Sequence, residues 1–244
     1  MLQSLRLLWN KSPDKLDLGP MKAWAAARGM DFRPVRDGGG CLVEPRAPQP
    51  TWRIEWGQSQ RGYMPGLELR IIGELGTPKE LMAMVLTKPL MAAIEKQVFE
   101  QYVEDVQTRA DTEAPPEMRW LVMYTKLTGQ ELGRLRERFG AVSNLPPWLM
   151  QWLAGALNDG LVGAADGTPA DEAMVMTIQL GRLTLRTPMQ AIEIKRVVLW
   201  LSVFERAMSE ARRLGREWVD AADSGRSTMP AAWPKSALPD NAGA

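Results

Sequence analysis

Two segments in the first third of the chain alternate between apolar and charged residues. One is TWRIEW at residues 51–56, and the other is LELRII at residues 67–72. Successive strand residues point to opposite faces of a sheet, so this alternation predicts two strands with one buried face each. The connection between them, residues 57–66, is rich in turn-forming residues. The pattern therefore predicts a meander of antiparallel strands.

Helical periodicity appears elsewhere in the chain. Apolar residues at four-residue spacing predict a helix over 89–108, and alanine-rich KAWAAAR predicts another over 22–28. The apolar run RWLVMY at 119–124 is typical of a buried strand, and residues 174–185 predict a hairpin around a glycine. A Thr-Pro pair then opens a long helix over 188–219. We therefore predict an α+β fold: antiparallel sheet segments packed with several helices, with a long C-terminal helix.

Two similar junctions suggest how the domains are organised. LTKP at 86–89 and LRTP at 185–188 each end a predicted strand and begin a predicted helix. They modestly favour two similar α+β lobes, residues 1–109 and 110–219, and one continuous domain is the alternative. Residues 220–244, which are rich in small and polar residues and in proline, are predicted to be a disordered tail.

The composition excludes several kinds of active site. The chain has no histidine and one cysteine, Cys41, so Ser-His-Asp and Cys-His catalysis, His-ligated metals and multi-cysteine sites are absent. We predict no catalytic, cofactor-binding or metal-binding residues. A net charge of +1, from 30 basic and 29 acidic residues, gives no electrostatic reason to expect nucleic acid as a partner. No export signal or transmembrane span is evident, which favours a cytoplasmic location. The overall style of the sequence suggests a bacterial protein.

Two helical segments carry residues suited to a protein interface. Tryptophan is enriched where proteins meet, and the segment after Pro146-Pro147 places two tryptophans on one helical face. The long C-terminal helix adds an amphipathic stripe. The candidate interaction residues are Trp148, Leu149, Trp152, Leu153, Phe204 and Met208.

A second candidate site lies on the charged face of the predicted sheet. The charged residues of the two alternating strands mix signs at positions that can pair across neighbouring strands, and Tyr63 and an arginine lie in the connection between them. The candidate polar-groove residues are Arg53, Glu55, Arg61, Glu68 and Arg70.

Three interpretations of function stay open at this stage. The first is a non-enzymatic protein that binds a protein partner or forms a homodimer. The second is a small-ligand binder, or an enzyme independent of histidine, that uses the polar groove. The third is peripheral membrane contact through the tryptophan-bearing helix.

Overall fold

A nine-stranded antiparallel sheet organises the part of the chain that the structure describes. The structure is a computed structural model and describes residues 16–36, 39–46, 48, 52–104 and 115–223. The order of the strands across the sheet is β1-β2-β3-β4-β9-β8-β5-β7-β6. Their bounds are β1 (Asp31–Pro34), β2 (Gly40–Glu44), β3 (Trp52–Gln58), β4 (Leu67–Glu74), β5 (Ala83–Thr87), β6 (Thr125–Lys126), β7 (Phe139–Ser143), β8 (Val175–Gln179) and β9 (Arg182–Pro188).

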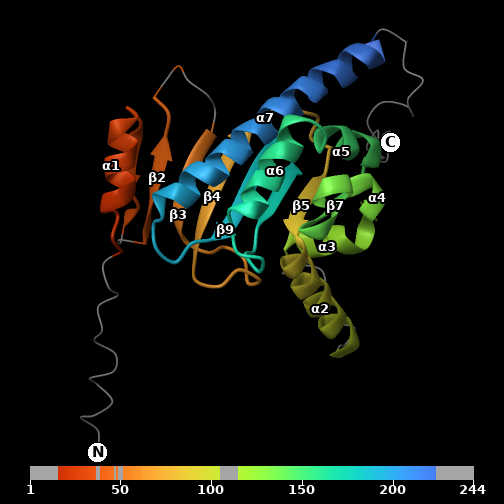
Figure 1. Cartoon of the computed structure of the whole chain (residues 1–244), viewed down its shortest axis with the longest axis horizontal. Helices are drawn as coiled ribbons and strands as arrows, with labels where there is room; N and C mark the ends of the chain where they lie inside the picture. Colours follow the sequence, from red (N-terminus) through yellow and green to blue (C-terminus); the bar gives the residue numbers. More distant parts are fainter. Residues whose placement is uncertain (1–15, 37–38, 47, 49–51, 105–114, 224–244) are drawn as a thin grey trace, which may run out of the picture.

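Helices cover both faces of this sheet (Figure 1). Their bounds are α1 (Gly19–Ala27), α2 (Lys88–Glu104), α3 (Pro116–Met123), α4 (Gly129–Leu132), the 3-10 helix η2 (Gly133–Glu137), α5 (Pro146–Trp152), α6 (Ala156–Asp166) and α7 (Ile194–Asp223). The α+β class, the antiparallel sheet and the long C-terminal helix predicted from the sequence are confirmed.

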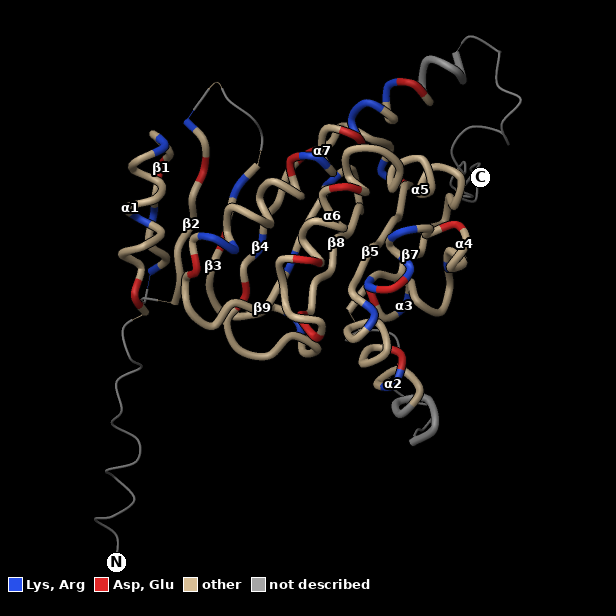
Figure 2. Tube along the Cα trace, viewed as in Figure 1, with Lys and Arg blue, Asp and Glu red and all other residues tan. Residues whose placement is uncertain are grey.

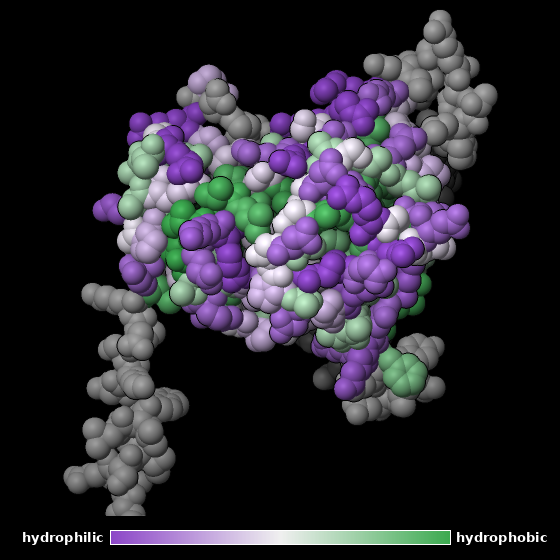
Figure 3. Space-filling view, viewed as in Figure 1, coloured by the Kyte–Doolittle hydropathy of each residue, from purple (hydrophilic) through white to green (hydrophobic). Residues whose placement is uncertain are grey.

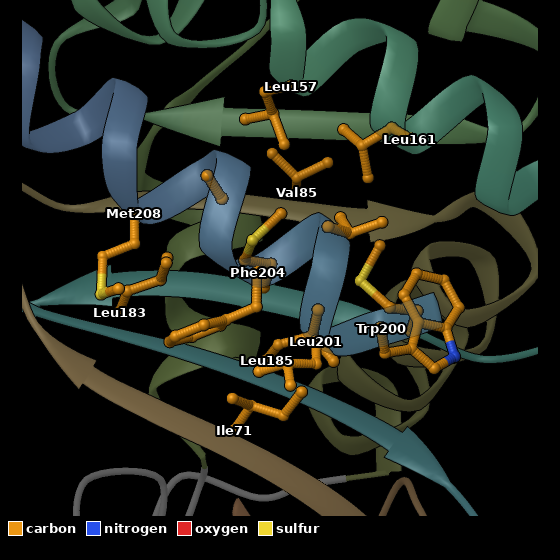
Figure 4. Close-up of a cluster of buried hydrophobic side chains, with 14 of the residues drawn as sticks. Ile71, Val85, Leu157, Leu161, Leu183, Leu185, Trp200, Leu201, Phe204 and Met208 are labelled. Carbon is orange, nitrogen blue, oxygen red and sulfur yellow. The ribbon is translucent and has the colours of Figure 1, made fainter. Parts of the chain in front are cut away.

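The larger core lies between the sheet and α7. The apolar positions of β3, β4 and β9 face this helix because alternate strand residues share a face. Trp200, Leu201 and Phe204 of α7 pack over Ile71 and Leu185, and α6 covers the neighbouring strands (Figure 4). In Figure 3, hydrophobic residues show beside α7, while hydrophilic residues cover most of the outer surface in that view.

The opposite face of the sheet carries a smaller core over one half only. Met84 and Leu86 of β5 and Val142 of β7 pack there against Leu90 of α2 and Met118 of α3. Among the described helices, α2 and α3 are those that contribute to this second core. The same face of β3, β4 and β9 carries charged residues instead, and this is where the charged candidate site lies.

Two local predictions from the sequence are wrong, and two elements were missed. Residues 119–124 belong mainly to helix α3, which begins with Pro116 at its first position, a common helix start. The predicted long helix does not begin at Pro188, because β9 continues to that residue and α7 begins at Ile194. β7 and α6 were not predicted.

Both halves of the chain contribute strands to this one sheet. β4 pairs with β9 along its length, from Glu68 opposite Pro188 to Glu74 opposite Arg182. β5 leads directly into α2 and β9 leads to α7, but α2 contributes to the smaller core and α7 to the larger one on the other face. The two-lobe division at residues 109 and 110 stays a prediction. The predicted tail, residues 220–244, begins too early, because α7 continues to Asp223, and residues 224–244 lie outside the described residues.

The tight turn between β8 and β9 contains a strained leucine. Gln179 pairs with Arg182, so Leu180 and Gly181 form a two-residue loop, and both have positive φ angles, 52° and 74°. A hairpin of this length favours Asn-Gly, because leucine is unfavourable in the left-handed region.

We expect Leu180→Asn to raise the free energy of unfolding by about 1 kcal/mol. The Leu180 side chain is exposed, so its removal costs little packing. Equilibrium urea unfolding measures the change, with Leu180→Ala as the control that removes the side chain and keeps the strain. Lower stability of the asparagine variant than of the alanine variant would contradict the strained-turn interpretation.

Candidate functional site

Charged side chains gather on the helix-free half of the sheet face described above. Basic and acidic residues are interspersed along the described chain as a whole (Figure 2), but here several of them are buried. We call this group the charged cluster. It consists of Arg53, Glu55, Arg61, Tyr63, Glu68, Arg70, Glu117 and Arg186.

Strand register brings the core of the charged cluster together. Glu55 of β3 lies opposite Arg70 of β4, and Arg70 lies opposite Arg186 of β9. Two arginines directly opposite each other repel, so this arrangement needs a carboxylate between them. Glu68, on the same face of β4, supplies it.

The carboxylate of Glu68 is fully buried and accepts hydrogen bonds from several donors. Its Oε1 accepts from Nη1 of Arg70 at 2.9 Å and from Nη1 of Arg186 at 2.6 Å. The backbone N–H of Gln60 also donates to Oε1, at 3.3 Å, and the hydroxyl of Ser59 donates to Oε2 at 3.2 Å. A buried charge is tolerated only when it is paired and hydrogen-bonded, and Glu68 meets this condition.

The connection between β3 and β4 closes one side of the charged cluster. Nε of Arg61 in this connection lies 3.1 Å from both carboxylate oxygens of Glu117, in the first turn of α3. Met64, three residues further on, is fully buried in the smaller core. These two anchors hold the connection against the sheet and α3.

The charged cluster opens toward solvent on the β3 side. The exposed fraction of the side chain falls from 41% at Arg53 to 19% at Glu55, 10% at Arg70 and 0% at Glu68. Arg53 donates to Glu55 at 2.7 Å, and Arg70 lies 2.9 Å from the other oxygen of Glu55. The ion pairs therefore form a continuous path from the surface to the buried carboxylate.

The charges act on one another's pKa values. Burial raises the pKa of Tyr63, the negative charge of Glu117 adds to this, and the positive charges of Arg61 and Arg186 oppose it. Burial lowers the pKa of Arg186, which Glu68 opposes. Burial also lowers the pKa of Arg61, but the charge and hydrogen bond of Glu117 outweigh it, so that this pKa is raised. Tyr63 is therefore a neutral phenol at physiological pH.

Cys41 lies outside the charged cluster, in β2. Its side chain is buried in the larger core, and burial raises the pKa of its thiol from 9.0 to about 12. A thiol is a nucleophile only when it is deprotonated, so Cys41 is a packing residue in this structure.

The six candidate interaction residues lie in the larger core. Trp148, Leu149, Trp152 and Phe204 have an exposed fraction of 0%, and the values for Leu153 and Met208 are 4% and 6%. The expectation that these side chains form an exposed docking or membrane-binding surface is therefore corrected. Trp152 donates its indole N–H to the backbone oxygen of Ala207 in α7 at 2.8 Å, so its polar edge has a partner inside the chain.

Two other kinds of site are absent from the described residues. No described helix is long and apolar enough to cross a membrane. Within the described ranges, no three or more Cys, Asp or Glu side chains are placed to hold a metal ion.

The five polar-groove residues predicted from the sequence all belong to the charged cluster, but two of its members were missed. Glu117 was not recognised because the segment after it was interpreted as a strand. Arg186 was not recognised because its pairing with Glu68 joins residues 118 positions apart in the chain. The alternation of Arg182, Thr184 and Arg186 was a usable signal, since it places Arg186 on the polar face of its strand.

Comparison with known proteins gives little further information. No family model and no curated protein matches the chain. Among solved structures, it is similar to the mycobacterial trehalose monomycolate transport factor A, TtfA, with 10% sequence identity and a TM-score of 0.43. The similarity covers 78% of this chain and 92% of that one. A likeness this distant carries no functional argument.

Proposed function

We propose that this protein is a non-enzymatic, cytoplasmic binding protein whose ligand site is the charged cluster. The observation that carries the proposal is the burial of the Glu68 carboxylate between two opposed arginines. Removing such charges from water costs several kcal/mol per ion, and apolar residues would stabilise the fold as well or better. Buried, mutually perturbed charged groups are enriched at functional sites.

The chemistry of the cluster favours binding over catalysis. A general base works best with a pKa near the working pH, and the chain has no histidine to supply one. Tyr63, whose pKa is raised, holds its proton, and both oxygens of Glu68 already accept hydrogen bonds. Arginine and tyrosine side chains instead offer fixed donors to a polar ligand.

A ligand screen combined with hydrogen exchange tests this proposal. Amino acids, organic acids, sugars and nucleosides would be screened by thermal unfolding and by product formation. At least one compound is expected to raise the melting temperature, to remain unchanged, and to slow amide exchange in residues 59–66 and in the first turn of α3. Protection confined to other elements, or turnover of a stabilising compound, would contradict the proposal.

Contact with a protein partner or a second copy of the chain is a second proposed function. It is supported by three exposed apolar side chains on neighbouring helices: Phe99 of α2 at 68%, Val122 of α3 at 69% and Met123 of α3 at 70%. Exposed apolar groups of this size are typical of interaction surfaces when they lie together. Light scattering across a concentration series tests self-association, and a constant monomer mass would argue against the homodimer.

A further inference from the structure

The charged cluster carries one more positive than negative group. The groups are counted at their formal charges, +1 for an arginine and −1 for a glutamate. The four arginines are Arg53, Arg61, Arg70 and Arg186, and the three carboxylates are Glu55, Glu68 and Glu117. One further negative group would make the cluster neutral.

Arg186, at the buried end of the cluster, has hydrogen-bond donors that the described residues do not use. Among the described residues, Arg186 donates one hydrogen bond, to an oxygen of Glu68 that it shares with Arg70. Arg61 and Arg70 are close enough to lower the pKa of Arg186 further. A guanidinium group has five N–H donors, so Arg186 has capacity for another acceptor.

A second donor at the same place has no partner. The hydroxyl of Tyr63 is buried and makes no hydrogen bond of normal length and geometry with the residues that the structure describes. After burial, the negative charge of Glu117 raises the pKa of this hydroxyl most, and the positive charges of Arg61 and Arg186 oppose that rise. A buried polar group without a partner is unfavourable, so the fold maintains a costly hydroxyl near a guanidinium that shares its one carboxylate oxygen with Arg70.

We propose that the corner formed by Arg61, Tyr63 and Arg186 binds the carboxylate group of the ligand. This inference rests on the proposed function and adds the chemical class of the ligand. A carboxylate is planar, carries one negative charge and accepts two parallel hydrogen bonds from a guanidinium. The hydroxyl of Tyr63 donates to one of its oxygens, and the single charge neutralises the cluster.

Matched neutral and charged probes test the proposal on the full chain. N-acetylglycine carries one carboxylate, N-acetylglycinamide is its neutral counterpart, and inorganic phosphate is an anion of different shape. Each would be titrated at neutral pH while the arginine Nε–H signals are followed by two-dimensional NMR. We expect N-acetylglycine to shift the Arg186 signal in a saturable way and to bind at least tenfold more tightly than either other probe.

The affinity of three variants for N-acetylglycine shows whether the probe binds at the proposed corner. Arg186→Gln is expected to weaken binding of N-acetylglycine about a hundredfold, because a charged partner is lost. Tyr63→Phe is expected to weaken it about tenfold, because one hydrogen bond to a charged group is lost. Arg182→Gln is the control: Arg182 lies on the same face of β9 but is exposed and pairs with Glu74, so affinity stays within about twofold of the original protein.

Tyr63→Phe also distinguishes a loss of ligand affinity from a loss of protein stability. Its hydroxyl has no partner in the structure, so the variant is expected to unfold at the same urea concentration as the original protein or at a higher one. It therefore remains a valid test even if Arg186→Gln does not fold.

The possible failures are distinguishable. Equal binding of the neutral amide, tighter binding of phosphate, or no shift at the highest soluble concentration of N-acetylglycine would overturn the carboxylate inference and leave the proposed function standing. N-acetylglycine binding that is unchanged in both Tyr63→Phe and Arg186→Gln would overturn the inference. If every compound found in the screen also binds both variants unchanged, the proposed function fails with it.

Discussion

Replacing Glu68 with alanine is expected to lower the free energy of unfolding by about 3–5 kcal/mol. The substitution leaves Arg70 and Arg186 opposite each other, with exposed fractions of 10% and 9% and without the carboxylate that they share. Uncompensated buried charge is among the most destabilising changes known for single substitutions. Equilibrium unfolding in urea, followed by tryptophan fluorescence, measures the loss.

The control for this prediction lies on the same strand and the same face. Glu74 pairs with Arg182, but both side chains are more than half exposed, so Glu74→Ala is expected to change stability by less than about 0.5 kcal/mol. Glu68→Gln keeps an acceptor oxygen without the charge, and we expect a loss between those of the two alanine variants. Equal losses for Glu68→Ala and Glu74→Ala would mean that the buried carboxylate does not hold the arginines in place.

Replacing Trp152 with alanine is the second change with a large expected effect, a loss of about 3–5 kcal/mol. The indole is fully buried, its ring centroid lies 5.5 Å from that of Trp148, and its N–H group donates to Ala207. The variant leaves a cavity between α5 and α7 and an unpaired backbone oxygen on α7. Urea unfolding, together with light scattering on the folded protein, tests both the loss of stability and any change in oligomeric state.

Two further substitutions separate the contributions of ring volume and hydrogen bonding to the loss of stability in Trp152→Ala. Trp152→Phe keeps most of the ring volume and removes the hydrogen bond, so a loss of about 1–3 kcal/mol is expected. Met150 lies two residues away on the same helix and is 41% exposed, so Met150→Ala is expected to cost less than about 0.5 kcal/mol. If Trp152→Ala dissociated a complex but left monomer stability unchanged, the interface interpretation of this helix would be restored.

Strands with one apolar and one polar face were predictable from the sequence. The alternation over 51–56 and 67–72 identified β3 and β4, and the same alternation placed Glu55, Glu68 and Arg70 on one face. The apolar run over 119–124 failed because a short run without periodicity fits a buried strand and a buried helix equally well. The fold class follows from local pattern, but the type of a short apolar element does not.

The candidate-site residues also differ in whether their contacts follow from local sequence or depend on tertiary packing. Cross-strand pairing between neighbouring strands of a meander is local, so the Glu55–Arg70 pair was within reach of sequence reasoning. The Arg61–Glu117 pair joins residues 56 positions apart and depends on how α3 packs, which no local pattern encodes. The tryptophans at 148 and 152 share a helical face, but periodicity does not say whether that face meets solvent or the core, and here it meets the core.

The pairing of β4 with β9 has a consequence for how the chain is synthesised. β4 ends at Glu74 and its partner β9 begins at Arg182, so more than a hundred residues leave the ribosome before this ladder can close. Until then, the β1–β4 meander presents an unpaired strand edge with a continuous apolar face, which is the kind of surface that recruits other nascent chains. Contacts so distant in sequence also slow folding. Protection of this edge until β9 has been synthesised is therefore expected to raise the yield of native protein.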